Sequence, residues 1–385
     1  MSTSPFRKLP VSLPELLAEG VKPMLQKPLP IEITRLTPDE TRERLTTARK
    51  RLGDELLILG HHYQRDEIIA WADIRGDSFK LSQKAAENRS AKYIIFCGVH
   101  FMAESADILA SENQIVILPN MSAGCSMADM ASDTQVQECW DDLATILDTS
   151  KVIPITYVNS TAALKAFVGR NGGSACTSSN AYRIVKWALE RGEKLLFFPD
   201  QHLGRNTAVQ LGLDPEKDML VWDPNKPFGG STPEEVKAKS VLLWKGHCSV
   251  HARFSVAQIA KSREQFPNVK VIVHPECSLE VVRASDLNGS TEVIIKTITE
   301  APSGSEWAVG TEINLVNRLA HEMPDKKIFC LDPVVCPCST MYRIHPHYLL
   351  WVMEGLLEGV VRNQVKVPAD IAADARISLE RMLTI

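Results

Sequence analysis

Residues 56–63 read LLILGHHY, a short apolar run followed at once by polar residues, and this pattern decides the fold. It returns along the chain, with a segment of helical character after each polar cluster. The other apolar runs of strand type are YIIF (93–96), IVIL (115–118), VIPITYV (152–158), LLFF (195–198), VLLW (241–244), VKVIV (269–273), VII (293–295) and KIFCL (327–331). Continuous apolar strands that alternate with helices are typical of parallel sheets covered by helices on both faces. The sequence therefore predicts an α/β protein.

The spacing of the polar clusters favours three similar units over one large sheet. We expect αβα-sandwich repeats of about 90 to 110 residues, each with a short parallel sheet. The predicted units are an N-terminal extension (1–36), a first repeat (37–130 with 339–385), a second repeat (131–240) and a third repeat (241–338). Ligands bind beyond the carboxyl ends of parallel strands. If the three repeats surround a pseudo-threefold axis, the active site lies at the centre, where the strand ends converge.

Two helices can be predicted from local sequence signals. Thr37 as N-cap, Pro38 at the first position and Glu40 three residues after Thr37 form a capping box, so a helix is expected from residue 38 to about Leu52. The segment from Tyr348 onward, YLLWVMEGLLEGVV, has apolar residues on all sides and predicts a buried helix.

Composition and charge exclude several classes of protein. The 385 residues carry 43 Lys and Arg against 47 Asp and Glu, a net charge of −4 without the basic surface that nucleic acid requires. No apolar stretch reaches the roughly 18 to 20 residues that span a bilayer, and the N-terminus does not resemble a signal peptide. Nine cysteines in such a chain predict reduced thiols and a cytoplasmic location.

Three cysteines follow strand-like segments, one in or at the edge of each predicted repeat. Cys125, Cys248 and Cys338 would converge if the strand ends face inward. Three thiolates suit a [4Fe–4S] cluster with only three protein ligands, whose fourth iron is open and acts on substrate as a Lewis acid. The alternative is that these residues are buried cysteines that pack as small hydrophobic side chains.

A second metal hypothesis involves residues that are close in sequence. Cys336, Cys338, His345 and His347 form a C-x-C…H-x-H pattern that permits a local zinc site, although the spacing is not a standard zinc pattern. No Walker A sequence and no well-placed G-x-G-x-x-G motif is present, so nucleotide binding is not supported.

Two strand-end clusters carry groups suited to acid–base chemistry. His61 and Tyr63 follow the first strand, and the alternative for these residues is a structural hydrogen bond. His274 and Glu276 follow a fully apolar strand, where burial is expected to raise the carboxyl pKa towards working pH; the alternative for Glu276 is a helix cap. Hydroxyl-rich turns at 176–180 and 289–292 offer donors to carboxylate or phosphate. A small polyanionic substrate fits this combination.

From about residue 40 to its C-terminus the chain resembles quinolinate synthases of the long-sequence type. The strings that carry the resemblance are GHHYQRDEI, FCGVHFMAESA, PNMSAGCSMADM, YVNSTAALKA, TSSNA, FFPDQHLG, LWKGHCSVH, VHPEC, GSTEVIIK, GTEINLV and CPCSTMYRIHPHYLLWVMEGLLEG. The resemblance implies a cytoplasmic transferase of NAD (pyridine nucleotide) biosynthesis, which condenses iminoaspartate with dihydroxyacetone phosphate to quinolinate, phosphate and water. It also implies three αβα repeats around a pseudo-threefold axis, an oxygen-sensitive [4Fe–4S] cluster, and a functional link to the L-aspartate oxidase that supplies iminoaspartate.

The resemblance further implies roles for individual residues. The cluster ligands are Cys125, Cys248 and Cys338, the last chosen because Met341 follows it by three residues, with Cys336 as the alternative. The expected catalytic residues are Tyr63, His61, His274 and Glu276. The expected substrate contacts are His61, Ser82, Tyr157, Val158, Asn159, Ser178, His274, Pro275, Glu276 and Thr291. The remaining cysteines, Cys97, Cys139, Cys176, Cys277 and Cys330, are expected to fill the core.

Two alternative functions would use the same predicted cluster site. A different [4Fe–4S] hydro-lyase would use the same open iron without the condensation. An iron–sulfur redox or oxygen sensor would hold a cluster, but it would not need His61, Tyr63, Glu276 and Ser178 around the metal.

Overall fold

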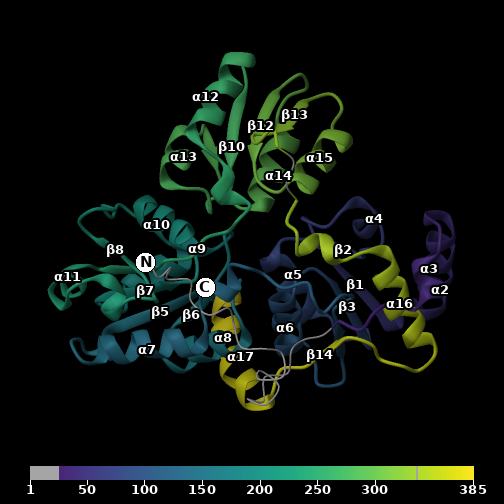
Figure 1. Cartoon of the computed structure of the whole chain (residues 1–385), viewed down its shortest axis with the longest axis horizontal. Helices are drawn as coiled ribbons and strands as arrows, with labels where there is room; N and C mark the ends of the chain where they lie inside the picture. Colours follow the sequence, from purple (N-terminus) through teal and green to yellow (C-terminus); the bar gives the residue numbers. More distant parts are fainter. Residues whose placement is uncertain (1–25, 335–336) are drawn as a thin grey trace, which may run out of the picture.

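The computed structural model describes residues 26–334 and 337–385, and it forms three lobes, each built on its own sheet with helices packed around it (Figure 1). The first sheet has the strand order β14-β4-β3-β1-β2, the second β6-β5-β7-β9-β8 and the third β11-β10-β12-β13. All pairs are parallel except β14 with β4. The predicted α/β class with three short parallel sheets is confirmed.

The described strands are β1 (Leu56–His61), β2 (Ile74–Gly76), β3 (Tyr93–Cys97), β4 (Ile115–Ile117), β5 (Val152–Tyr157), β6 (Ser174–Cys176), β7 (Lys194–Phe198), β8 (Met219–Trp222), β9 (Val241–Trp244), β10 (Lys270–Val273), β11 (Leu287–Asn288), β12 (Glu306–Gly310), β13 (Lys327–Cys330) and β14 (Gln364–Val365). The α-helices are α2 (Ile31–Thr34), α3 (Pro38–Leu52), α4 (Asp66–Ile69), α5 (Ser78–Glu87), α6 (His100–Leu109), α7 (Asp133–Ala144), α8 (Ala162–Arg170), α9 (Ala181–Leu189), α10 (Gln201–Gln210), α11 (Pro233–Ala238), α12 (Val256–Gln265), α13 (Leu279–Ala284), α14 (Thr291–Glu300), α15 (Ile313–Glu322), α16 (Pro346–Leu357) and α17 (Ala369–Thr384). Short 3₁₀ helices are η1 (Gly53–Glu55), η2 (Ala128–Met130), η3 (Thr149–Lys151), η4 (Pro227–Gly230), η5 (His251–Arg253) and η6 (Met341–Arg343).

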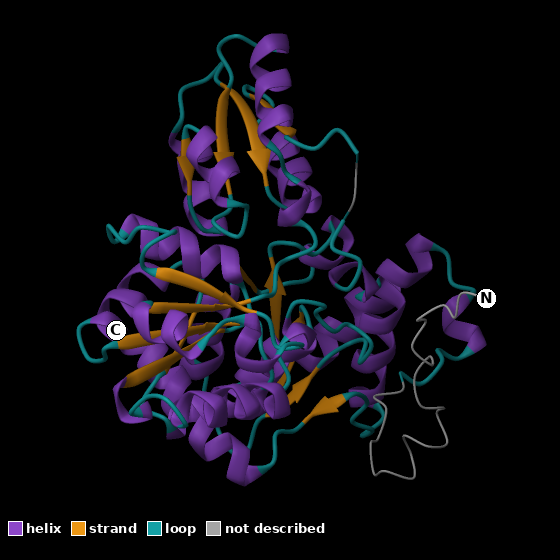
Figure 2. Ribbon diagram, turned by 60° about the vertical axis from the view of Figure 1, so that its left-hand side comes forward, coloured by secondary structure: helices purple, strands orange, loops and turns teal. Residues whose placement is uncertain are grey.

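The central strands are buried along their whole length, as their apolar sequences require. Every residue of β1, β3, β5 and β9 is buried, because helices cover both faces of the sheets. Figure 2 shows the strands of the upper lobe, which is the lobe of the third sheet, ending towards the centre of the molecule. The polar residues that follow the strands are therefore carried to the middle of the protein.

Both predicted helices are confirmed, although α16 begins at Pro346 and ends at Leu357, before the end of the quoted segment. Thr37 accepts a hydrogen bond from the Glu40 backbone N–H, and the Glu40 carboxylate accepts one from the Thr37 N–H, so α3 starts with a complete capping box. Helix α16 is buried on most of its surface, as its apolar sequence predicts.

One predicted strand is wrong. Residues 293–295 (VII) lie in α14, whose N-cap is Ser290; its side chain accepts a hydrogen bond from the Val293 N–H. The β-branched run suggested a strand, but Ile294 and Ile298 are the buried positions of the helix, and their spacing is helical. The cap and the apolar spacing outweigh the β-propensity of the three residues.

The sheets place two segments differently from the predicted division into repeats. Strand β9 was assigned to the third repeat by the boundary at residue 241, but it pairs with β7 and β8 in the second sheet. Helix α17 was assigned to the first repeat, but it packs against α8 and β6 of the second lobe (Figure 1). Strand β14 joins the first sheet and α16 packs against α3. The other predicted boundaries stay predictions.

The remaining differences between the predicted and the observed elements concern short segments. Part of the predicted extension, at 31–34, is helical, and residues 1–25 lie outside the described residues. The sequence did not predict strands β2, β6, β8, β11, β12 and β14, which are short or lack a run of β-branched residues. Among the described helices, none is long and apolar enough to cross a membrane.

The contact between α8 and α17 leaves no room for a side chain at Gly169. A Cβ at this position would lie 2.1 Å from the Asp374 carbonyl oxygen of α17. We predict that Gly169→Ala lowers the free energy of unfolding by about 1 to 3 kcal/mol, because the backbones have to move apart. Alanine has the higher helix propensity, so without this contact the change would stabilise the protein. Urea unfolding tests the sign, with Glu380→Ala on the exposed side of α17 as the control.

Candidate active site

A cavity of about 110 Å³ lies between the three lobes, where the ends of strands from all three sheets meet. Its lining contains most of the residues that the sequence singled out. The predicted residues that line it are His61, Tyr63, Cys125, Tyr157, Asn159, Ser178, Cys248, His274, Glu276, Thr291 and Cys338. The structure thus brings together groups that are far apart in sequence, such as His61 and Cys338.

The three cysteines occupy the same place in three equivalent turns. Each lies three residues before a short 3₁₀ helix, η2, η5 or η6. The carbonyl oxygen of each cysteine accepts a hydrogen bond from the backbone N–H four residues later, at 3.1 Å for Cys125, 3.0 Å for Cys248 and 2.9 Å for Cys338. Each of these three cysteines is also followed by serine; the fourth Cys-Ser pair of the sequence, Cys277-Ser278, is not part of such a turn. This local geometry makes Cys338 the structural equivalent of the other two.

The three thiols are chemically suited to bind a metal. Burial raises the thiol pKa of Cys125 to about 12 and also raises those of Cys248 and Cys338. Negative charge on one of the three further disfavours ionisation of its neighbours, because they lie close together. A bound cation reverses this balance, since the thiolate is the form that coordinates a metal.

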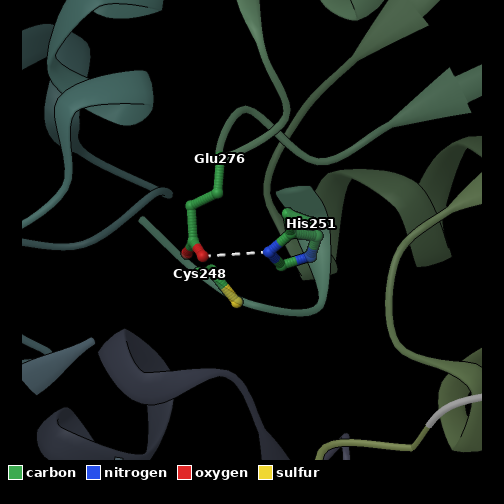
Figure 3. Close-up of side chains that lie close together, drawn as sticks. All are labelled: Cys248, His251 and Glu276. Carbon is green, nitrogen blue, oxygen red and sulfur yellow. Dashed lines mark hydrogen bonds and ion pairs between the residues drawn. The ribbon is translucent and has the colours of Figure 1, made fainter. Parts of the chain in front are cut away.

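The alternative metal ligands named from the sequence are Cys336, His345 and His347. Cys336 lies outside the described residues. His345 caps α16, where its Nδ1 accepts a hydrogen bond from the His347 N–H. Within the described part of the chain, the one group of His, Cys and acidic side chains close enough to share an ion is Cys248, His251 and Glu276, whose ligand atoms lie within 4.8 Å of one another (Figure 3). The local zinc pattern is therefore not assembled by Cys338, His345 and His347.

Glu276 is the buried charge at the centre of the site. His251 Nδ1 lies 2.9 Å from its Oε2 (Figure 3), and the Tyr157 hydroxyl donates to its Oε1 at 2.5 Å. Burial alone would raise the carboxyl pKa, but the adjacent imidazoles of His251 and His274 and the hydrogen bonds from His251 and Tyr157 lower the pKa of Glu276 to about 2. The expected upward shift is wrong, because its partners outweigh burial; Glu276 is an ionised acceptor at neutral pH.

A continuous chain of hydrogen bonds joins Tyr63 to Glu276. The Tyr63 hydroxyl lies 2.8 Å from Thr311 Oγ1, and Thr311 Oγ1 lies 3.1 Å from His251 Nε2. Because the Glu276 carboxylate accepts from Nδ1–H of His251, its Nε2 is assigned as the acceptor from Thr311. Burial and the charge of Glu276 raise the pKa of Tyr63, so its hydroxyl is protonated at rest.

His61 and His274 are held as neutral donors. Burial lowers the pKa of each to about 3. Nδ1 of His61 accepts from the Tyr63 N–H at 3.1 Å, and Nδ1 of His274 accepts from the Glu276 N–H at 3.3 Å. The proton of each imidazole is therefore assigned to Nε2, which in His274 faces Ser178 Oγ at 3.2 Å.

Three predicted substrate contacts do not line the cavity. Ser82 is buried in α5 and donates to the Ser78 carbonyl oxygen. Val158 packs in the core, and the Pro275 carbonyl oxygen accepts from Asn206 Nδ2. Their roles as substrate contacts stay predictions.

The sequence interpretation also missed residues that the structure places in the site. His251 belongs to the string KGHCSVH, but it was not singled out because it follows Cys248 in a turn. Thr311 follows β12, a strand that was not predicted, so its strand-end position was hidden. The cavity lining includes no Lys or Arg among the described residues, so anion binding falls to hydroxyl, amide, imidazole and backbone donors.

The fold and the site together define an α/β enzyme in which strand ends from three sheets enclose a thiol-lined cavity with acid–base groups. Residues 43–384 match the model of the family described as quinolinate synthetase A protein, and the chain belongs to this family.

Similar proteins are found across diverse bacteria. The quinolinate synthase of Corynebacterium glutamicum is 56% identical over 360 residues, which cover 94% of this chain and 91% of that protein. That of Herpetosiphon aurantiacus is 58% identical over 353 residues, or 91% of this chain and 94% of the relative. That of Streptomyces coelicolor is 54% identical over 345 residues, covering 89% and 87% of the two chains.

The equivalent turns predict which thiols bind iron. We expect Cys125→Ser, Cys248→Ser and Cys338→Ser to lose most of the bound iron after anaerobic purification, whereas Cys336→Ser retains it. Cys330→Ala, which changes a thiol outside the cavity lining, is the matched control. Iron and sulfide analysis with an absorbance spectrum measures the outcome. Iron lost from Cys336→Ser and kept by Cys338→Ser would overturn the assignment.

Proposed function

We propose that the chain catalyses the condensation of iminoaspartate with dihydroxyacetone phosphate to quinolinate. The other products are phosphate and two molecules of water, so the atoms of the two substrates equal those of the products. Membership of the quinolinate synthetase A family supports the reaction. The observation that carries the proposal is the central cavity, which collects three thiols and the groups of Tyr63, His251 and Glu276 from separate lobes.

The donor set fits a [4Fe–4S] cluster held by Cys125, Cys248 and Cys338. Three thiols on equivalent turns face one cavity, and burial keeps them protonated until a cation binds. When bound, such a cluster supplies an iron without a protein thiolate, which is a Lewis acid towards a substrate carboxylate, nitrogen or hydroxyl. A cytoplasmic location, which suits a cluster that oxygen destroys, stays a prediction.

The polar lining is suited to the two carboxylates of the product and to the phosphate of the substrate. His274 Nε2–H donates to Ser178 Oγ, so the Ser178 hydroxyl proton is free to point towards a substrate anion. Asn159 and Thr291 add amide and hydroxyl donors, and His61 adds an N–H. Substrate binding by His61, Tyr157, Asn159, Ser178, His274, Glu276 and Thr291 is part of the proposal. Substrate contact by Ser82, Val158 and Pro275, which lie outside the cavity lining, stays a prediction.

The proton path gives Tyr63 its role as acid and base. Tyr63 can give its proton to Thr311 as Thr311 gives its own to His251 Nε2, and the resulting imidazolium is stabilised by Glu276. The reverse transfer returns a proton to Tyr63. Proton removal and return of this kind are required in carbon–carbon bond formation, isomerisation, ring closure and dehydration. The high pKa of Tyr63 makes the coupled transfer necessary, because free tyrosinate would be rare.

The substrates also suggest a functional link. Iminoaspartate hydrolyses readily in water, so an L-aspartate oxidase that produces it is the expected supplier. The proposal includes this metabolic link and makes no claim of physical docking.

Thr311→Val tests the proton path without changing the shape of the side chain much. We expect kcat for quinolinate formation to fall by about 100-fold or more, because the hydroxyl that joins Tyr63 to His251 is lost. Iron content and the absorbance spectrum should be unchanged. Thr41→Val, which removes a buried hydroxyl of α3 outside the cavity lining, is the matched control. Wild-type kcat in Thr311→Val would contradict the path.

Glu276→Gln tests whether the site is an enzyme centre or a sensor. The variant should keep its iron and lose turnover by about 100-fold or more, because the amide no longer stabilises a charged His251. A product assay with iminoaspartate and dihydroxyacetone phosphate gives the result. Absence of quinolinate formation by iron-replete wild type would refute the proposed function itself.

A further inference from the structure

The N-terminal half of α15 contacts a proposed metal ligand. Glu312 is fully buried, and its Oε1 accepts a hydrogen bond from the Cys338 backbone N–H at 3.1 Å. The same carboxylate accepts from the Asn314 N–H and side-chain amide, at 2.8 and 2.9 Å, so it also caps α15. Glu312 therefore fixes the backbone of Cys338 to the start of a helix in the third lobe.

The next turns of α15 contact the loop that carries Tyr63. The Arg318 guanidinium, only 6% exposed, donates to the carbonyl oxygens of His62 and Gln64 and to Asp66 Oδ1. Asn314 Nδ2 donates to the Tyr63 carbonyl oxygen at 3.3 Å. The planar fork of Arg318 thus binds the backbone on both sides of Tyr63.

The two contacted segments come from different parts of the molecule. The Tyr63 loop connects β1 to α4 in the first lobe, and Cys338 lies after the last strand of the third sheet. They also contact each other directly, since Arg65 donates to the Tyr342 carbonyl oxygen at 2.8 Å and Gln64 Nε2 lies 3.3 Å from Met341 Sδ. A helix is a rigid spacer. Contacts from one helix to both segments therefore set their relative position.

We propose that Glu312 and Arg318 are positioning residues, which use α15 to fix Tyr63 relative to the thiol of Cys338. Glu312 acts on the metal ligand, and Arg318 acts on the acid–base loop. Neither residue lines the cavity, so neither needs to touch substrate. The inference rests on the proposed function for the role of Tyr63, while the contact with Cys338 is independent of the reaction.

The variants test separately the contact of Glu312 with Cys338 and the contact of Arg318 with the Tyr63 loop. Glu312→Gln and Glu312→Ala are expected to release iron to ferrozine roughly tenfold faster under anaerobic conditions, because support of the ligand is weakened. The electron paramagnetic resonance spectrum of the reduced protein should change with them. Arg318→Lys should release iron at the wild-type rate, but its kcat per bound iron should fall about tenfold or more with little change in KM, because a single ammonium cannot hold both carbonyl oxygens.

Asn317→Ala, on the exposed side of the same helix, is the matched control and should behave as wild type in both assays. Wild-type iron release in both Glu312 variants would overturn the role of Glu312. Wild-type kcat per iron in Arg318→Lys would overturn the role of Arg318, and so would a lower melting temperature with both assays unchanged. Failure of wild type to form quinolinate would refute the proposed function, whereas the iron-release comparison would still decide the contact between Glu312 and Cys338.

Discussion

Three thiols from separate loops have to meet in one cavity, and much of the architecture depends on this constraint. Each cysteine comes from a turn of the same construction, with the same backbone hydrogen bond and a 3₁₀ helix at the same distance. Short parallel sheets direct their strand ends towards one point, so a repeated lobe supplies a repeated thiol. A single large sheet would place its strand ends along a line. Division into three lobes is the simpler way to surround a compact group with protein.

The second constraint is the burial of the Glu276 carboxylate in a cavity whose described lining contains no Lys or Arg. Glu276 remains ionised in the interior because His251 and Tyr157 donate to it, and the alignment of His251 follows from this contact. Thr311 and Tyr63 extend the alignment to the cavity surface. The orientation of the acid–base groups is therefore determined by one carboxylate. The neutral donors around it can bind an anionic substrate without a fixed positive charge, which would also attract other anions.

Sequence reasoning reached the fold class, the capped helix at residues 38–52 and most of the titratable side chains in the cavity lining, because apolar runs and strand-end polar residues carry local signals. It failed where the decision is made by tertiary contacts. The 293–295 run is helical because its isoleucines pack at helical spacing, and Thr311 was hidden behind the weak strand β12. The pKa direction of Glu276 depends on His251, which is 25 residues away in sequence. Assignment of α17 to the second lobe likewise depends on a contact that no local pattern encodes.

The packing of α17 on α8 has a consequence for synthesis. Two segments near residue 385 return to the first two lobes. Strand β14 completes the first sheet, and helix α17 covers part of the second lobe. While the ribosome is still translating, α8 and β6 therefore lack the helix that shields their apolar surface. Domains of many proteins fold as units in the order of their synthesis, but here the first two lobes are completed by residues 364–384, which are translated after the third sheet.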